Sequence, residues 1–549
     1  MARLSCALAL LSLLCGTLLS GPVAARDTSV ASLNARRLEA VKRWELSARD
    51  SNVQGNARRD MAALALPKVK NITFSNPKAS RAYAKILYAL CVIPSHAFAE
   101  FFVDGTTLPQ VNFDVVLRQM RVGWWGPLGR LLKRATFVLL ISQLFFWFFP
   151  PGPEGSLDDL IFWTNGGPGC SSLEGAFQEN GPFTWATGQA LPTQNEWSWT
   201  NLSSVLYVEQ PVGTGFSQGK PTARNENDVA AQLVGFLQQF LEIFSELKGK
   251  KFYLTGESYA GMYVPYIANF IYENTTRSTL DLDLQGIWIN DPVLGWDVVQ
   301  SQIPAVGFVH KYEHVFAFNQ TFLAHLDSVA EACNYADYIQ KHVTYPPQGL
   351  LPLPGKSTEA DPGCDVWDTI FDAALLVNPA LISIWPILWD VLGFPGSFFQ
   401  AQVSPLYFDR ADVKAAIHAP ANVDWAECSN INVFPHGDGS LPPAFTVLPN
   451  VIEKSNRTVI VHGLGDFILI AEGARIVLQN MTWAGEQGFQ TPIANDSFIV
   501  DGVGALGNIH TERGLTYAEI SLAGHMVPQF SPVASLQIMK YLLGFRESP

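Results

Sequence analysis

The chain has 549 residues, of which 49 are acidic and 36 basic, so its formal net charge is −13 and its pI is about 5.3. This acidity argues against nucleic-acid partners and suits solubility in an acidic, secreted or vacuolar setting. The length fits one large domain with an insertion, and the sequence contains no internal repeat, no Cys/His metal cluster and no phosphate-binding loop with a lysine, so we expect no metal and no cofactor.

Residues 1–25 predict a secretory signal peptide. An apolar core, Ala7–Leu14, follows one arginine, and Val23–Ala25 supplies the small residues of a cleavage site. The apolar core is too short to span a bilayer, which disfavours a membrane anchor. Residues 26–65 are polar with basic pairs, so they are either a pro-segment or an exposed charged helix, and the main domain is expected over 66–549.

Asn-x-Ser/Thr sequons agree with passage through the secretory pathway. We expect several of them to carry glycans, and we expect the protein to be secreted, with the vacuole as the alternative destination. The sequons are at Asn71, Asn201, Asn274, Asn319, Asn456, Asn480 and Asn495.

A β-prone run, 251–255, leads through Gly256–Gly261 into a helical pattern. This spacing predicts a strand-to-helix turn whose strained backbone exposes the oxygen of Ser258, while the N–H of Tyr259 points to where an oxyanion would form. The flanking glycines are needed because side chains there would collide. Alone the match is weak, since serines between glycines are common in ordinary turns.

Two later strands supply partners for this serine. The run 458–462 ends just before Asp466, and the run 518–522 ends just before His525. The order Ser, Asp, His is that of the α/β-hydrolases and not of trypsin-like or subtilisin-like enzymes. Asp466 alone could be a loop acid and His525 a packed histidine, but their joint placement makes a catalytic set the better interpretation.

The stretch between these elements completes the expected architecture. Ile287–Pro292 predicts a further core strand, and residues 296–400 mix helical periodicity with Pro-rich loops, which indicates a cap inserted over the core. We therefore predict an α/β class protein with the α/β-hydrolase fold, in which a mixed central sheet has helices on both faces.

Over roughly residues 145–545 the chain resembles the serine carboxypeptidase family, through five motifs in the family's order. These motifs are Trp163–Ser172, Glu179–Pro182, Glu209–Ser217, Gly256–Gly261 and Gly524–Pro528. The resemblance implies a fungal-type secreted enzyme that releases C-terminal amino acids from peptides and proteins through an acyl-enzyme. The acidity and the short apolar runs predict no nucleic-acid and no membrane partner, and the protein is expected to be a monomer or a homodimer.

The motifs and the resemblance assign the reacting groups. Ser258 would attack the carbonyl carbon of the last peptide bond, His525 would act as general base and then acid, and Asp466 would hold its tautomer. The oxyanion would accept hydrogen bonds from the N–H of Tyr259 and, by resemblance, of Gly167, each worth about 3 kcal/mol.

By resemblance, Asn165, Glu257 and Glu179 bind the carboxylate of the substrate. An acid can bind an anion when it is protonated, so Glu257 is expected to share a proton with Glu179. Two close carboxyl groups cannot both ionise cheaply, and one pKa should therefore rise. Peptide binding is then expected to be stronger at acidic pH.

The resemblance also implies two disulfide bonds. These are Cys170–Cys428, which ties the Gly-rich loop to the core, and Cys333–Cys364 within the cap. Because Cys6 and Cys15 leave with the signal peptide, Cys91 remains unpaired.

Residues 81–99 and 116–141 depart from the family pattern. The basic, Trp-containing segment 116–134 and the apolar run 135–149 could form a membrane-surface helix or an anchor. That run is shorter than the roughly 20 residues of a spanning helix. We interpret both atypical segments as translated introns or a faulty gene model, which also explains the unpaired cysteine.

Two other functions stay open because a fold does not dictate its chemistry. One is an acyltransferase on the same scaffold, which would use the same residues with a different acceptor. The other is a catalytically inactive secreted glycoprotein. The residues preferred around the scissile bond depend on the cap and are not predicted.

Overall fold

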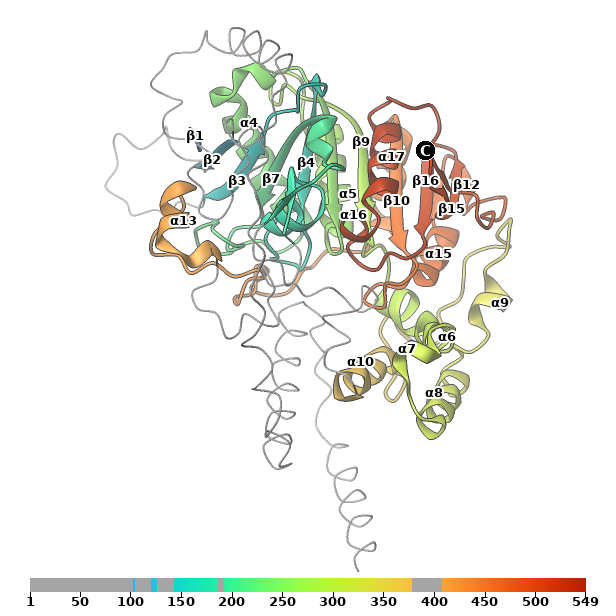
Figure 1. The fold of residues 1–549 in the computed structure, drawn as a ribbon. Helices are drawn as coiled ribbons and strands as arrows, with labels where there is room; N and C mark the ends of the chain where they lie inside the picture. Colours follow the sequence, from blue (N-terminus) through green and yellow to red (C-terminus); the bar gives the residue numbers. More distant parts are fainter. Residues whose placement is uncertain (1–101, 104–119, 126–142, 186–191, 378–406) are drawn as a thin grey trace, which may run out of the picture.

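The computed structural model describes residues 102–103, 120–125, 143–185, 192–377 and 407–549. Within this part of the chain the core is a mixed sheet of ten strands, in the order β1-β2-β3-β7-β4-β8-β9-β10-β16-β15 (Figure 1). The run from β7 to β16 is parallel, and the remaining pairs are antiparallel. The predicted mixed sheet is therefore confirmed.

The strands of this sheet are β1 (Phe102–Val103), β2 (Met120–Trp125), β3 (Leu144–Phe149), β4 (Ser156–Thr164), β7 (Ser203–Glu209), β8 (Lys251–Glu257), β9 (Asp283–Asn290), β10 (Arg457–Gly463), β15 (Gly507–Glu512) and β16 (Leu515–Ile520). Three small hairpins pair β5 (Phe183–Thr184) with β6 (Thr193–Gln194), β11 (Thr482–Trp483) with β12 (Glu486–Gln487), and β13 (Ile499–Val500) with β14 (Gly504–Ala505). The helices around the sheet are α4 (Glu226–Ile243), α5 (Ala260–Asn274), α13 (Ala411–Ala416), α14 (Leu448–Lys454), α15 (Ala471–Asn480), α16 (Val527–Phe530) and α17 (Pro532–Leu542).

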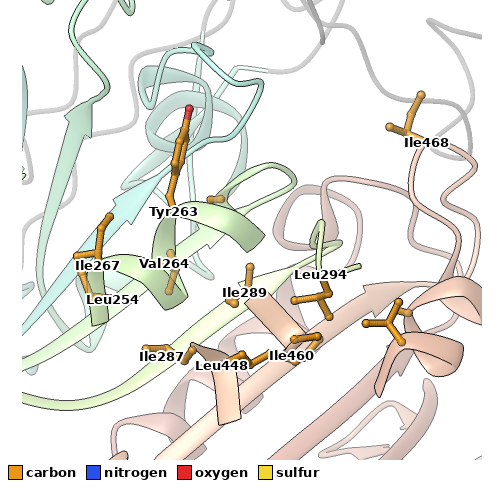
Figure 2. Packing of buried hydrophobic residues seen from close by; sticks show 14 of the residues in the cluster. Leu254, Tyr263, Val264, Ile267, Ile287, Ile289, Leu294, Leu448, Ile460 and Ile468 are labelled. Atoms are coloured by element: carbon orange, nitrogen blue, oxygen red, sulfur yellow. The ribbon is translucent and has the colours of Figure 1, made fainter. Parts of the chain in front are cut away.

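Helices cover both faces of the sheet because its strands are apolar on both sides. In β3, Phe146 and Phe148 belong to one buried cluster, whereas Phe145 and Trp147 belong to the other. A strand sends alternate side chains to opposite faces, so the continuous apolar run fills two cores. Figure 2 shows part of the first cluster, where Ile287, Ile289 and Ile460 of the strands lie near side chains of α5 and α14.

The cap predicted over 296–400 is described in part. Helices α6 (Ile303–Lys311), α7 (Glu313–Phe316), α8 (Gln320–Ala332), α9 (Tyr338–His342) and α10 (Val366–Val377) fall within it. Figure 1 shows α6, α7, α8 and α10 grouped to one side of the parallel strands. The Cys333–Cys364 disulfide closes a loop in this group. Residues 378–400 lie outside the described part, so the extent of the cap stays a prediction.

Strand β2 lies inside the atypical segment 116–141. It pairs antiparallel with β3, and Arg121 lies opposite Phe148. Residues 1–65, 81–99 and the rest of 116–141 are outside the described residues, so the signal peptide, the pro-segment and the translated introns stay predictions. Among the described helices, none combines the length and the hydropathy that crossing a bilayer requires.

Candidate active site

Ser258 occupies the sharp turn between β8 and α5. Its φ is +64°, an uncommon left-handed backbone for a residue with a side chain. The turn is held on both sides, because Ser258 N–H donates to Asn290 O and Val293 N–H donates to Ser258 O, each at 3.0 Å. A side chain on Gly261 would collide with the backbone of Val293. The predicted strand-to-helix turn is thus present at the carboxyl end of a central strand.

Asp466 and His525 meet at the same edge of the sheet. They follow β10 and β16, which are parallel neighbours, and His525 Nδ1 lies 2.7 Å from Asp466 Oδ2. Ile468 N–H donates to the other carboxylate oxygen at 2.8 Å. Gly465 N–H donates to Ala523 O at 2.8 Å and ties the two loops together. The acid and the imidazole are therefore buried and mutually oriented.

The imidazole of His525 is also influenced by the residue that precedes Ser258. Burial of His525 opposes its protonation, but the charge and the hydrogen bond of Asp466, together with the charge of Glu257, raise its pKa above the ordinary value. Glu257 immediately precedes Ser258 in the chain. The turn, the imidazole and the aspartate therefore lie within electrostatic reach of one another.

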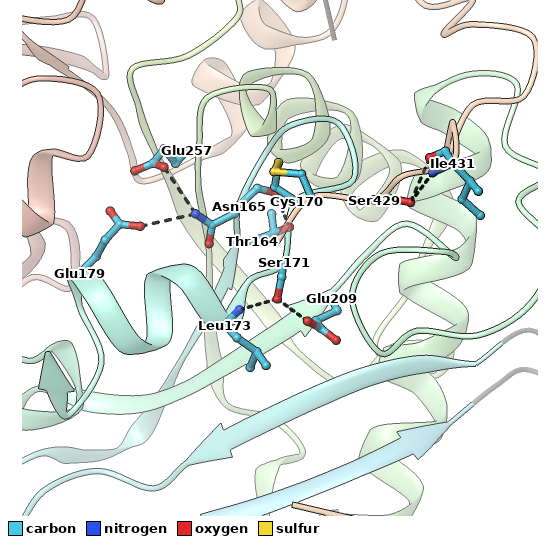
Figure 3. The surroundings of a disulfide bond; sticks show 11 residues. Thr164, Asn165, Cys170, Ser171, Leu173, Glu179, Glu209, Glu257, Ser429 and Ile431 are labelled. Atoms are coloured by element: carbon cyan, nitrogen blue, oxygen red, sulfur yellow. Dashed lines mark hydrogen bonds between the residues drawn. A yellow bond between two sulfur atoms is a disulfide. The ribbon is translucent and has the colours of Figure 1, made fainter. Parts of the chain in front are cut away.

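The Gly-rich loop after β4 packs on the turn that contains Ser258. A Cβ on Gly166 would lie 2.7 Å from Glu257 O and would collide with the backbone N of Tyr259. Gly167 has a φ of +113°, which suits glycine. The disulfide between Cys170 and Cys428 closes this loop, as the resemblance implied (Figure 3). The loop and the N–H of Tyr259 thus lie next to each other.

The three residues assigned to carboxylate binding are brought together. Figure 3 shows the amide of Asn165 between two carboxyl groups, with Nδ2 3.5 Å from Glu179 Oε1 and 3.4 Å from Glu257 Oε1. Asn165 Oδ1 accepts a 2.7 Å hydrogen bond from Trp163 Nε1, which orients the amide. The second oxygen of Glu257, Oε2, accepts from Asn290 Nδ2 at 2.8 Å.

Glu179 and Glu257 are both buried, and the charge of Glu257 affects the pKa of Glu179. Burial, and next the charge of Glu257, raise the pKa of Glu179 well above its ordinary value. Burial also raises the pKa of Glu257, although His525 and hydrogen bonds act in the opposite direction. Both carboxyl groups face the same amide nitrogen of Asn165, so they are close enough that ionising both at once is costly.

Two buried residues beside Asp466, Asp291 and His462, were not predicted from the sequence. Asp291 Oδ1 accepts from Gly463 N–H at 2.8 Å, and His462 Nε2 lies 3.6 Å from Asp291 Oδ1 and 4.0 Å from Asp466 Oδ2. Burial, and next the charge of Asp466, raise the pKa of Asp291 well above its ordinary value. Asp291, like Asp466, follows a β-prone run, and this position is a sequence signal that could have indicated Asp291 as a site residue.

Most of the predicted glycosylation sites that are described lie on the surface. The exposed ones are Asn201, Asn274, Asn319, Asn456 and Asn495. Asn480 is half-buried, and its Oδ1 accepts from Leu351 N–H at 2.9 Å. Asn71 lies outside the described residues. Glycosylation stays a prediction at each of these positions.

A serine in a strained strand-to-helix turn, with an aspartate and a histidine at the carboxyl ends of neighbouring parallel strands, defines an α/β-hydrolase. Comparison with known proteins narrows the class. The family model described as serine carboxypeptidase matches residues 141–544, and the chain belongs to the serine carboxypeptidase family. It is a serine-type carboxypeptidase, and its disulfides indicate the secretory pathway.

Individual relatives agree with this assignment. A probable serine carboxypeptidase of Arthroderma benhamiae is 43% identical over 522 residues, which cover 90% of this chain and 94% of that protein. Serine-type carboxypeptidase F of Aspergillus niger is 44% identical over 443 residues, or 74% of this chain and 82% of that protein. The crystal structure of KEX1(delta)p, a prohormone-processing carboxypeptidase from Saccharomyces cerevisiae, superposes with a TM-score of 0.63 at 22% identity, covers 82% of this chain and 97% of that chain, and shares the fold.

Proposed function

We propose that this carboxypeptidase uses Ser258, His525 and Asp466 as its catalytic residues and is favoured at acidic pH through tighter binding of its peptide substrates. The observation that carries the proposal is the position of two buried carboxyl groups beside the amide of Asn165, one of them on the residue before Ser258. An exopeptidase needs such a cradle for the terminal carboxylate close to its nucleophile.

The reaction proceeds in two halves. Ser258 Oγ attacks the carbonyl carbon of the last peptide bond while His525 takes the hydroxyl proton, which it then gives to the leaving amine. The tetrahedral oxyanion accepts from the N–H groups of Tyr259 and Gly167, each worth about 3 kcal/mol. Water, deprotonated by His525, then hydrolyses the acyl-enzyme. Asp466 holds the Nδ1–H tautomer throughout, and none of these steps needs a cofactor.

The terminal carboxylate binds between Asn165 and the protonated form of Glu257. Asn165 Nδ2–H donates one hydrogen bond, and the carboxylic acid of Glu257, supported by Glu179, donates the other. Because the pKa values of both glutamates are raised, this proton is present at acidic pH and is lost as the pH rises through the raised pKa. Peptide binding therefore weakens on the alkaline side.

We also propose that the substrates are the C-termini of peptides and proteins, and that the enzyme is secreted and not vacuolar. The exposed sequons and the disulfides support export. Mass spectrometry of the medium and of purified vacuoles from the source organism would separate the two destinations.

The test of carboxylate recognition compares a blocked peptide with its C-terminal amide between pH 4 and 8. We expect the KM of the peptide acid to rise with pH, and that of the amide to stay nearly constant. Replacing Glu257 with Gln should remove this difference in pH dependence. The matched control is Glu273→Gln, the same change at an exposed site near the far end of α5. A flat KM for the peptide acid would contradict the proposal.

A further inference from the structure

The same Trp-x-Asn sequence pattern lies on both sides of the carboxyl end of β8. Strands β4 and β9 are the two neighbours of β8, and Trp163 and Trp288 both lie opposite Thr255 in the register. Two residues beyond each tryptophan stands an asparagine, Asn165 on one side and Asn290 on the other. A residue and its second neighbour along a strand share a face. Each asparagine therefore lies on the same face of the sheet as the tryptophan two residues before it.

Each indole orients the amide that follows it. Trp288 Nε1 lies 3.2 Å from Asn290 Oδ1, and because an indole N–H only donates, it must face the amide oxygen. Asn290 Nδ2 then points at Glu257 Oε2, 2.8 Å away. The side chains of Trp288, Asn290 and Glu257 are all buried. The amide therefore has one orientation, with its N–H on Glu257.

The two asparagines hold Glu257 unequally. Asn290 makes one short bond to Oε2, whereas Asn165 Nδ2 is shared at 3.4 and 3.5 Å between Glu257 and Glu179. A bond near 2.8 Å is well formed, and bonds near the outer limit are weak. Asn165 thus remains available to a substrate, while Asn290 holds Glu257 in place.

A protonated carboxyl group has one hydroxyl and one carbonyl oxygen, and an N–H donor bonds the carbonyl oxygen. We propose that Asn290 is a positioning residue for recognition of the terminal carboxylate: by donating to Oε2 of Glu257, it keeps the proton on Oε1, beside Asn165. The inference rests on the proposed role of Glu257 in binding that carboxylate. Without Asn290 the proton can occupy either oxygen, and the side chain can rotate.

The charged groups around Glu257 provide a second test, the pH dependence of peptide binding. Glu257 is faced by Glu179 at the end of the π-helical turn η3 (Gly175–Glu179), by His525 and Asp466 at the sheet edge, and by Asp291 after β9. The bond from Asn290 favours the ionised form of Glu257. Its removal should raise the pKa of Glu257, so peptide binding should weaken at a higher pH than in the wild type.

The experiment measures kcat and KM for a blocked peptide acid and its amide in Asn290→Leu, Asn290→Asp and Trp288→Phe. For Asn290→Leu at pH 5 we expect the KM of the acid to rise about tenfold, with kcat within about twofold and the KM of the amide unchanged. The rise of KM with pH should also shift to higher pH. Trp288→Phe removes only the orienting N–H, so a smaller change, about threefold, is expected in the same direction.

The outcomes separate the inference from the function on which it rests. If Glu257→Gln alters the ratio of acid to amide KM but Asn290→Leu and Trp288→Phe do not, Asn290 has no positioning role and the proposed site stands. If Glu257→Gln leaves the ratio unchanged, the proposed site itself is wrong. If Asn290→Leu does not fold, Trp288→Phe and Asn290→Asp provide the test of the positioning role. An equal loss of activity on the peptide acid and on its amide overturns the inference. Asn450→Leu, on α14, serves as the control for losing a side-chain amide.

Discussion

A carboxylate oxygen of Asp291 and one of Asp466 lie within 4.8 Å of each other, although the two residues follow different strands, β9 and β10. Two buried carboxyl groups this close cannot both ionise cheaply, so one of them should carry a proton. The raised pKa of Asp291, caused by burial and then by the charge of Asp466, assigns that proton to Asp291. Asp466 can then keep its charge for His525.

Asparagine substitutions at these two aspartates should have opposite results. Asp466→Asn should lower kcat about 10⁴-fold, because the amide favours the wrong tautomer of His525. Asp291→Asn replaces a neutral acid with a neutral amide, so kcat should stay within about threefold of the wild type. Steady-state kinetics on one peptide will check both. Equal damage by the two changes would show that Asp291 works as an anion.

Replacement of Ser258 by alanine should remove catalysis and leave binding intact. We expect kcat to fall by at least about 10⁴-fold, because the nucleophile is lost while the carboxylate site remains. Labelling by a fluorophosphonate probe should disappear, and calorimetry should still detect peptide binding. Residual labelling of the variant at the wild-type rate would place the nucleophile elsewhere.

Neutralising Glu257 should also change the titration of His525. The negative charge of Glu257 is one of the influences that raise the pKa of His525. His525 must be deprotonated to act as a base, so kcat falls as the pH drops through this pKa. In Glu257→Gln the acidic fall of kcat for an ester substrate should therefore move to lower pH. An unchanged profile would mean that Glu257 is already neutral wherever His525 titrates.

The two disulfides should differ in their importance for catalysis. Removing Cys170–Cys428 frees the Gly-rich loop beside Tyr259, so we expect both a loss of about 2–5 kcal/mol in unfolding free energy and a lower kcat. Removing Cys333–Cys364 in the cap should cost a similar stability with kcat nearly unchanged. Paired Cys→Ser variants, compared by Tm and by ester hydrolysis, test the difference.

The ion pair of half-buried Arg475 with buried Glu519 should stabilise the fold at neutral pH. Burial disfavours the Glu519 carboxylate, but its bonds to Arg475 outweigh that effect and leave its pKa below the ordinary value. The contribution is thus present above the unfolded-state pKa and is lost as the pH falls through the folded one. Arg475→Ala should cost about 3–5 kcal/mol in urea unfolding at pH 7.

The more exposed pair of Lys311 and Glu472 is the control for that measurement. Its side chains are 42% and 26% exposed, so Lys311→Ala should cost less than about 1 kcal/mol. Equal effects of the two substitutions would show that burial does not govern the strength of the Arg475–Glu519 pair.

Local patterns in the sequence determined much of this protein. The glycine-flanked Ser258 could be placed in a turn because strand and helix periodicity change within a few residues around it. Asp466 and His525 could be named because each follows a β-prone run. These features depend on neighbours along the chain, so a single sequence is sufficient to show them.

Only the tertiary structure decided which strands lie side by side and in which register. That pairing brings Asn290 to Glu257 and Asp291 to Asp466. The position of Asp291 after a β-prone run is visible in the sequence, but neither contact is. The position of a residue along a strand sets which face its side chain occupies, but not which strand lies beside it. The physical reason is that strand pairing and burial are collective, whereas turns and periodicity are local.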